Sequence, residues 1–284
     1  MSHQRPHFVT SLERITADPG GGASTTPSVT LHDVVTALDT ELRTIEVPDY
    51  PGAMNGLQVA NRGQVTRVAV AVDASRAAIA ETAISGADLL IVHHGLFWGG
   101  TQPLVGVAYD KFCSLLTNGI AVYASHLPLD LHPTHGNNAR LAEAFGLVPT
   151  AGFSRFKGVE IGVCGESDES TAQLLARVHS YATRYGGTVR TSIPANERTT
   201  RRWAICSGGG ASSESLREAR ERGIDTLIVG EGPHHTTVEA IEHDLCIIYA
   251  GHYATETLGV QSLGAWLERR FGLPWSFLHL PTGS

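Results

Sequence analysis

The chain repeats itself, and this repeat limits the folds that it can adopt. Two pairs of segments match: GADLLIVHHG at 86–95 with GIDTLIVGEG at 223–232, and IAVYASH at 120–126 with CIIYAGH at 246–252. In the second pair a carboxylate follows the histidine four residues later in both copies, as Asp130 after His126 and Glu256 after His252. Each segment holds an apolar run of strand length, which is typical of parallel strands buried between two layers of helices. We therefore predict an α/β fold of two related units that arose by internal duplication, with a cleft between them.

The rest of the chain alternates between helical and strand patterns. Helices are predicted at 29–45, 74–85, 109–118, 136–145, 170–185 and 213–222, in a segment that ends at 242, and from 252 to about 270. Strands are predicted at 65–72, 87–92, 120–124, 159–164, 188–193, 203–206, 226–229 and 246–250. Pro128 indicates an irregular loop around His126 and Asp130, because proline interrupts regular helices. We assign 1–28 to a flexible tail, 29–149 to the first unit and 150–284 to the second, with metal ligands from both.

Composition excludes several classes of protein. A net charge of −7 argues against nucleic acid as a partner, because binding phosphate backbones needs a basic face. The four cysteines show no C-x-x-C spacing, so neither a disulfide framework nor a thiolate zinc site is indicated. No apolar window approaches the roughly 18 residues that span a bilayer, and the N-terminal segment lacks a signal-peptide core. We expect a cytoplasmic protein that does not bind membranes.

Histidines and carboxylates gather where the predicted strands end, which is where open α/β sheets bind ligands. His93 and His94 follow an apolar run and precede Gly95, and we expect a turn there because adjacent residues of an extended strand point to opposite faces. His252 and Glu256 are four residues apart, so on a helix they share one face. With Asp130 they make five candidate ligands, more than one tetrahedral ion uses. We predict a pair of divalent ions about 3.5–4 Å apart, which would activate water for hydrolysis.

Each of these features also has an ordinary explanation. A histidine pair is commonly a loop feature, His252 with Glu256 could be a solvated pair on a helix, and Asp130 could cap a helix. Their joint occurrence at strand ends of a duplicated chain favours the metal site. Mixed histidine and carboxylate ligands suit zinc, iron, manganese, cobalt and nickel, and do not choose between them.

Four motifs resemble the signatures of the NIF3-like (DUF34) family of dinuclear metal centre hexameric proteins. They are NGLQV at 55–59, LLIVHHGLFW at 89–98, YASHLPLDLHPTHGNN at 123–138 and GHYATE at 251–256. The resemblance, which runs from about residue 29 to the end, implies a dinuclear site with His93, His94, Asp130, His252 and Glu256 as ligands. It also implies a toroidal homo-hexamer whose sites face an interior cavity. Some members of the family are labelled GTP cyclohydrolase 1 type 2.

Three further features receive weaker assignments. His126, equivalent to His252 in the repeat, is assigned either to the residues that surround the metal ligands or to the substrate pocket, where a histidine can orient a ligand or move a proton. Glu231, equivalent to His94, is a second pocket candidate, with a loop carboxylate of no role as the alternative. The segment 207–210, Ser-Gly-Gly-Gly, could bind an anion through its backbone amides.

Two functions remain open from the sequence. The first is a hydrolase that uses two divalent ions to act on a small nucleotide-like, phosphorylated or heterocyclic substrate. The second is a metal-binding or regulatory protein without turnover. A hydrolase needs open coordination positions and access for its substrate, whereas a structural site is closed by protein ligands.

Overall fold

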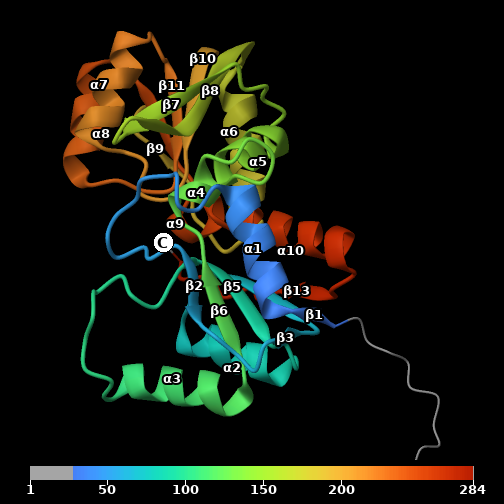
Figure 1. Cartoon of the computed structure of the whole chain (residues 1–284). Helices are drawn as coiled ribbons and strands as arrows, with labels where there is room; N and C mark the ends of the chain where they lie inside the picture. Colours follow the sequence, from blue (N-terminus) through green and yellow to red (C-terminus); the bar gives the residue numbers. More distant parts are fainter. Residues whose placement is uncertain (1–27, 284) are drawn as a thin grey trace, which may run out of the picture.

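The computed structural model describes residues 28–283, so the tail predicted at 1–28 lies outside the described residues except for Ser28. Two sheets, each with helices on both faces, lie one above the other (Figure 1), which confirms the predicted α/β class. In the described part of the chain, no helix combines the length and apolar character needed to cross a membrane.

The first sheet has five strands. Its order is β13 (Trp275–Phe277), β4 (Val68–Asp73), β5 (Leu89–His94), β6 (Ala121–Ala124) and β2 (Gly56–Val59), with only β2 antiparallel to its neighbour. Helices α2 (Arg76–Ile84) and α3 (Val107–Asn118) cover one face, and α1 (Leu31–Leu42) packs on the other. The fully buried runs of β4 and β5 explain their continuous apolar sequences. A small ribbon of β1 (Val29–Thr30) and β3 (Gln64–Val65) lies beside α1.

The second sheet has six strands. Its order is β7 (Ala151–Phe156), β8 (Val159–Ser170), β10 (Thr199–Cys206), β11 (Thr226–Val229), β12 (Cys246–Tyr249) and β9 (Arg190–Thr191). Helices α7 (Ser213–Glu221) and α8 (His234–Glu242) cover one face, while α5 (Asn137–Ala144) and α6 (Thr171–Arg184) cover the other. Ser212 caps α7 by accepting from the Ser215 amide, so the helix begins at the residue predicted from the sequence.

The two sheets share one connectivity, as the predicted duplication requires. In each, an antiparallel edge strand is followed along the chain by three parallel strands, so β2-β4-β5-β6 corresponds to β9-β10-β11-β12. The repeated segments at 86–95 and 223–232 contain the central strands β5 and β11.

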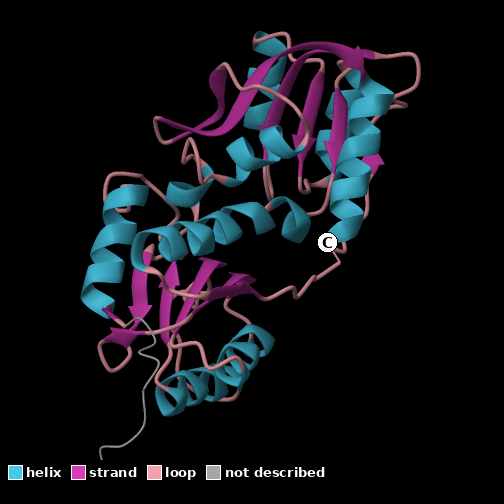
Figure 2. Cartoon of the chain, turned by 90° about the vertical axis from the view of Figure 1, so that its right-hand side faces the viewer, coloured by secondary structure: helices cyan, strands magenta, loops and turns pink. Residues whose placement is uncertain are grey.

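The units exchange the helices that follow their last parallel strands. Helix α5 follows β6 of the first sheet, but its Leu141 and Phe145 pack in the core of the second. Helix α10 (Thr257–Phe271) follows β12 of the second sheet, but its Val260 and Leu263 pack on the first, and it lies between the two sheets in Figure 2. Residues 257–277, assigned by sequence to the second unit, therefore return to the first sheet.

Other local predictions were wrong for identifiable reasons. The region around Pro128 forms a one-turn helix, α4 (Leu127–Asp130), because proline in a first turn costs no helical hydrogen bond. The helix predicted from 252 is interrupted at Glu256, separating α9 (His252–Thr255) from α10. There the Ala254 carbonyl accepts hydrogen bonds from the hydroxyls of Tyr181 and Thr257. Strands β7 and β13 were not predicted, and β8 and β10 are longer than predicted.

Candidate metal centre

The ends of the parallel strands from both sheets meet at one cavity of about 930 Å³. His94 reaches it from the end of β5, His126 from the segment after β6, and His252 from the segment after β12. The turn predicted at the histidine pair was wrong, because His93 and His94 are the last two residues of β5. Their rings lie 4.8 Å apart, so the end of the strand suffices to bring both into one cluster.

Four imidazoles in this cluster are held in the same way. Each ring binds an oxygen through Nδ1: the Ser125 carbonyl for His93, Asp73 for His94, Asp49 for His126 and Glu231 for His252, at 2.9, 2.9, 2.9 and 2.8 Å. Because these oxygens accept, each Nδ1 carries the hydrogen, and each neutral ring presents its Nε2 lone pair. This is how histidines that bind metals are usually oriented.

Glu256 and Asp130 face these Nε2 atoms at distances that suit a shared ion. Glu256 Oε2 lies 3.2 Å from His252 Nε2 and 3.4 Å from His94 Nε2, and Oε1 lies 3.5 Å from His93 Nε2. Asp130 Oδ2 is also 3.5 Å from His93 Nε2. Two ligands about 2.1 Å from one ion at tetrahedral angles stand roughly 3.4 Å apart, so these spacings fit a cation between the atoms.

Two buried atoms of the cluster have no hydrogen-bond partner. They are His93 Nε2 and Glu256 Oε2, on side chains that are almost completely buried. Buried polar atoms are nearly always paired, so an unpaired nitrogen and an unpaired carboxylate oxygen in one cluster indicate a place that suits a cation. The residues present therefore fit a metal centre.

The cluster contains two overlapping groups of ligand atoms, each within 4.8 Å of one another. One consists of His93, His94 and His126, and the other of His94, His252 and Glu256. Together with Asp130, all five predicted ligands come together in one place. His126, assigned from the sequence to the substrate pocket, lines the cavity and also lies within reach of an ion held by His93 and His94.

The crossing of the exchanged helices fixes Asp130. Asn137 donates to Asp130 Oδ1 at 2.8 Å and Ser207 donates to the same atom at 3.1 Å, which leaves Oδ2 for the cluster. The other end of the Asn137 amide accepts from the Gly259 backbone at 2.8 Å. Asn137 begins α5 and Gly259 lies in α10, so the ligand's orientation depends on contact between the two units.

The charges in the cluster oppose the effects of burial. Burial lowers the pKa of His93, but the carboxylates of Asp130 and Glu256 reverse this and raise its pKa well above the usual range. Burial raises the pKa of Glu256, but His94 and His93 hold it well below its usual range. The two buried carboxylates thus stabilise positive charge in the cluster. A divalent cation would supply such charge.

Gly208 makes room for Glu256. Its φ of +59° suits glycine, and a Cβ atom at this position would overlap Glu256 Oε1 and touch His252. Its amide donates to Thr255 Oγ1 and the Ser207 amide donates to Asn138, so these two amides are engaged within the protein. Gly208 thus serves the close approach of Glu256, and the anion site predicted for 207–210 stays a prediction.

The residues that orient the histidines were mostly missed from the sequence. The predicted strand at 65–72 ends just before Asp73, and no local sequence pattern marks Asp73, Asp49, Asn137 or Ser207 individually. One signal existed for Asp73: it ends the strand beside β5 and pairs in register with His94. Glu231, a weak pocket candidate by sequence, lies beside His252 and holds its ring.

A family model described as Duf34/NIF3 (NGG1p interacting factor 3) matches residues 29–281. The chain belongs to this family. The resemblance stated from the sequence motifs is thereby confirmed.

Members of the Duf34/NIF3 family match over most of their length. A Deinococcus radiodurans protein is 37% identical, covering 84% of this chain and 90% of its own length. A Pyrococcus horikoshii protein is 39% identical, covering 88% and 98%. Both are named GTP cyclohydrolase 1 type 2 homolog. The solved structure of TTHA1606 from Thermus thermophilus is 34% identical, with a TM-score of 0.75 and coverage of 90% of this chain and all of the other.

Proposed function

We propose that this Duf34/NIF3 protein is a hydrolase that uses two divalent metal ions to act on a small nucleotide-like, phosphorylated or heterocyclic substrate. The arrangement of the histidines supports this proposal most directly, because four Nε2 atoms and two buried carboxylates converge at an open cavity. A purely structural site would be closed by its protein ligands. The cavity of about 930 Å³ leaves room for a small molecule beside the ligands.

The residues divide into three roles in this proposal. The five side chains that would hold the ions are His93, His94, Asp130, His252 and Glu256. Two ions bound there would lower the pKa of a coordinated water and stabilise negative charge that develops on the substrate. The outer oxygens of Asp73, Glu231 and Ser125 keep the rings oriented, so that ligand geometry is set before the substrate enters.

We assign His126 to the substrate, although it lies near the ligands. Asp49 fixes its Nδ1, and Nε2 is left to hold or transfer a proton at the cavity wall. Burial raises the pKa of Asp49, but the hydrogen bond with His126 and the charge of that ring lower it overall, so the carboxylate remains ionised and keeps accepting from Nδ1.

The nucleotide-like substrate class rests on the names of the relatives and on the size of the cavity. The two relatives described above carry names that refer to GTP cyclohydrolase 1. The geometry of the site limits the substrate further. The substrate must carry an electrophilic carbon or phosphorus that can reach the carboxyl ends of β5 and β12.

Elemental analysis coupled to a hydrolysis screen tests the proposal. The purified protein should contain two ions per chain and should hydrolyse at least one member of a panel of nucleotides and phosphoesters. Glu256→Ala should hold at most one ion and lose activity, because Glu256 faces three Nε2 atoms. The matched control is Glu221→Ala, which replaces an exposed glutamate on α7 and should retain both the two ions and the activity. Two bound ions without turnover of any compound would favour a metal-binding or regulatory protein.

A further inference from the structure

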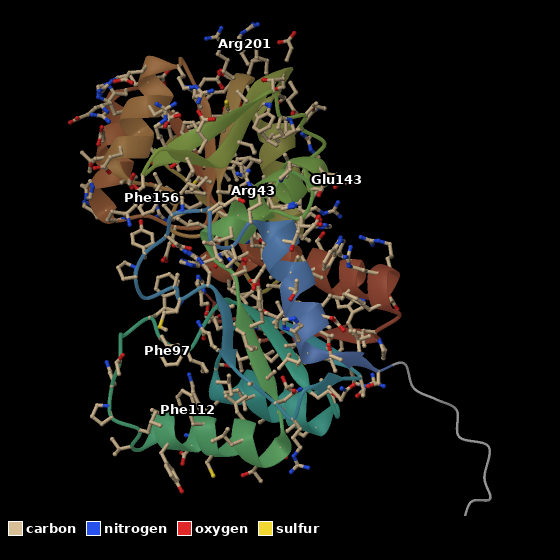
Figure 3. The ribbon with its side chains drawn as sticks, in the orientation of Figure 1. Arg43, Phe97, Phe112, Glu143, Phe156 and Arg201 are labelled. Atoms are coloured by element: carbon tan, nitrogen blue, oxygen red, sulfur yellow. The ribbon has the colours of Figure 1, made fainter. Side chains whose placement is uncertain are left out.

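Tyr50, Trp98 and Phe156 line the cavity, and two of these aromatic side chains are exposed to solvent. Tyr50 and Trp98 are 49% and 38% exposed, although they lie beside the buried cluster. Tyr50 contacts Phe156 with ring centres 4.7 Å apart and stands 6.5 Å from Trp98. These residues come from the loop before β2, the segment after β5 and the end of β7. Figure 3 shows Phe156 at the edge of the second unit that faces the first.

The aromatic residues reach the candidate metal centre itself. Trp98 meets His126 edge-on with ring centres 4.8 Å apart and lies 5.6 Å from the His94 ring. Tyr50 stands 6.1 Å from the His126 ring. A planar ligand stacked on Trp98 or Tyr50 would therefore have its edge beside the imidazoles of the cluster.

Two cationic side chains flank Phe156 at the same wall. Lys157 Nζ lies 5.1 Å from the Phe156 ring centre and donates to the Asp49 carbonyl at 2.8 Å. The Arg155 side chain is 70% exposed, and its ion pair with Glu160 is long, at 3.8 Å. Both residues line the cavity in a chain of net charge −7. Glu214 also lines this cavity, whereas its other carboxylates, Asp73, Asp130 and Glu256, belong to the histidine cluster or hold its rings.

We propose that Tyr50, Trp98 and Phe156 bind a planar heteroaromatic ring of the substrate, and that Arg155 and Lys157 bind an anionic group attached to it. The proposal deepens the proposed function and rests on it, because it names the part of the substrate that is held while another part faces the ions. Stacking of a base on exposed aromatic rings tolerates many ring systems and supplies much of the affinity of such ligands.

Binding of three probes to the metal-loaded full chain tests the proposal. Calorimetry would compare guanosine 5′-monophosphate, guanosine and ribose 5-phosphate, and each sample would then be checked for turnover. The nucleotide should bind at least tenfold more tightly than either fragment. Trp98→Leu and Tyr50→Leu should each weaken the nucleotide about tenfold, or about 1.4 kcal/mol, and leave ribose 5-phosphate within twofold. Tyr109→Leu, an exposed tyrosine on α3 that does not line the cavity, should change nothing.

The charge variants test the second half of the proposal. Arg155→Met combined with Lys157→Met should weaken the nucleotide about tenfold and leave guanosine unchanged. Elemental analysis of every variant shows whether its ions are retained. Trp98→Phe, which keeps an aromatic ring, should restore the affinity for the nucleotide. Wild-type affinity for the nucleotide in Trp98→Leu and Tyr50→Leu would overturn the proposal, as would equally tight binding of ribose 5-phosphate.

The same measurements separate this proposal from the proposed function. Binding that depends on the aromatic residues, with two ions and no turnover of any compound, would support the subsite and contradict the hydrolase. Turnover that is unaffected by Trp98→Leu and Tyr50→Leu would support the hydrolase and contradict the subsite.

Discussion

Single oxygen atoms decide what each histidine of the cluster can do. An imidazole has two nitrogens. In each of these rings Nδ1 is hydrogen-bonded to one oxygen, which belongs to Asp73, Asp49, Glu231 or Ser125. The other nitrogen then faces the cluster without a choice of tautomer. The metal-binding chemistry therefore depends on residues that would not themselves touch an ion.

Gly208 offers a test of how tightly the ligands are packed. Gly208→Ala should lower metal content and activity, because its Cβ would displace the Glu256 carboxylate. The backbone, at a φ of +59°, should also cost about 1–2 kcal/mol of stability. Gly209→Ala is the matched control, since a Cβ there meets nothing within 4 Å. Equal metal content in the two variants, measured by elemental analysis, would contradict this account of Gly208.

His126 and His94 should respond differently to replacement. His126→Ala should lower turnover by about 10²–10⁴-fold, the usual contribution of a proton-transferring residue, while metal content stays near that of the parent. His94→Ala should lower both, because His94 belongs to both groups of candidate ligands. Parallel loss of metal and turnover in His126→Ala would make His126 a ligand, as its place beside His93 also permits.

The sequence predicted which five side chains gather at the cluster but not the residues that orient them, for a physical reason. His93, His94, Asp130, His252 and Glu256 follow apolar runs within a repeat, so the pattern that predicts the strands also places these residues. Asp49 lies in a loop whose path depends on tertiary contacts, and its link to His126 spans 77 residues. No local pattern indicates such a pairing.

At the scale of elements, the exchange of α5 and α10 gives each sheet a helix from the other half of the repeat. Periodicity shows that a helix has an apolar face but not which sheet covers it. For that reason α10 was predicted to belong to the second unit, although Val260, Leu263 and Leu267 pack on the first. Strand β13 has three residues, too few for a recognisable alternation, and pairs with β4 far away in the chain.

The exchange predicts that the two sheets unfold together. Leu263→Ala should cost about 2–5 kcal/mol, because Leu263 is fully buried in the first core. Leu116→Ala, at a position 65% exposed on α3, should cost less than about 0.5 kcal/mol. Hydrogen exchange followed by mass spectrometry in urea should show β5 and β11 losing protection at one denaturant concentration in both variants. Separate transitions would mean that the units are independent.

At the scale of the whole molecule, the toroidal hexamer stays a prediction that rests on the family resemblance. Several large apolar side chains in or near α2 and α3 are exposed, among them Ile84 at 78% and Val105 at 70%. Light scattering at micromolar concentration should give about six times the mass of one chain, 30.2 kDa. A stable monomer would contradict the prediction.

The place of α10 in the chain also affects how the protein is made. Strands β2, β4, β5 and β6 of the first sheet are synthesised before the second sheet, yet the helix and the strand that complete the first sheet, at 257–277, follow every strand of the second. Domains usually fold as they leave the ribosome, in order from the N-terminus. Here the apolar face that packs against α10 stays uncovered until the strands of the second sheet have been made, and Glu256 emerges directly before α10. Folding and assembly of the ligand cluster are thus expected to finish in one late step, and the unfinished chain needs protection from aggregation until then.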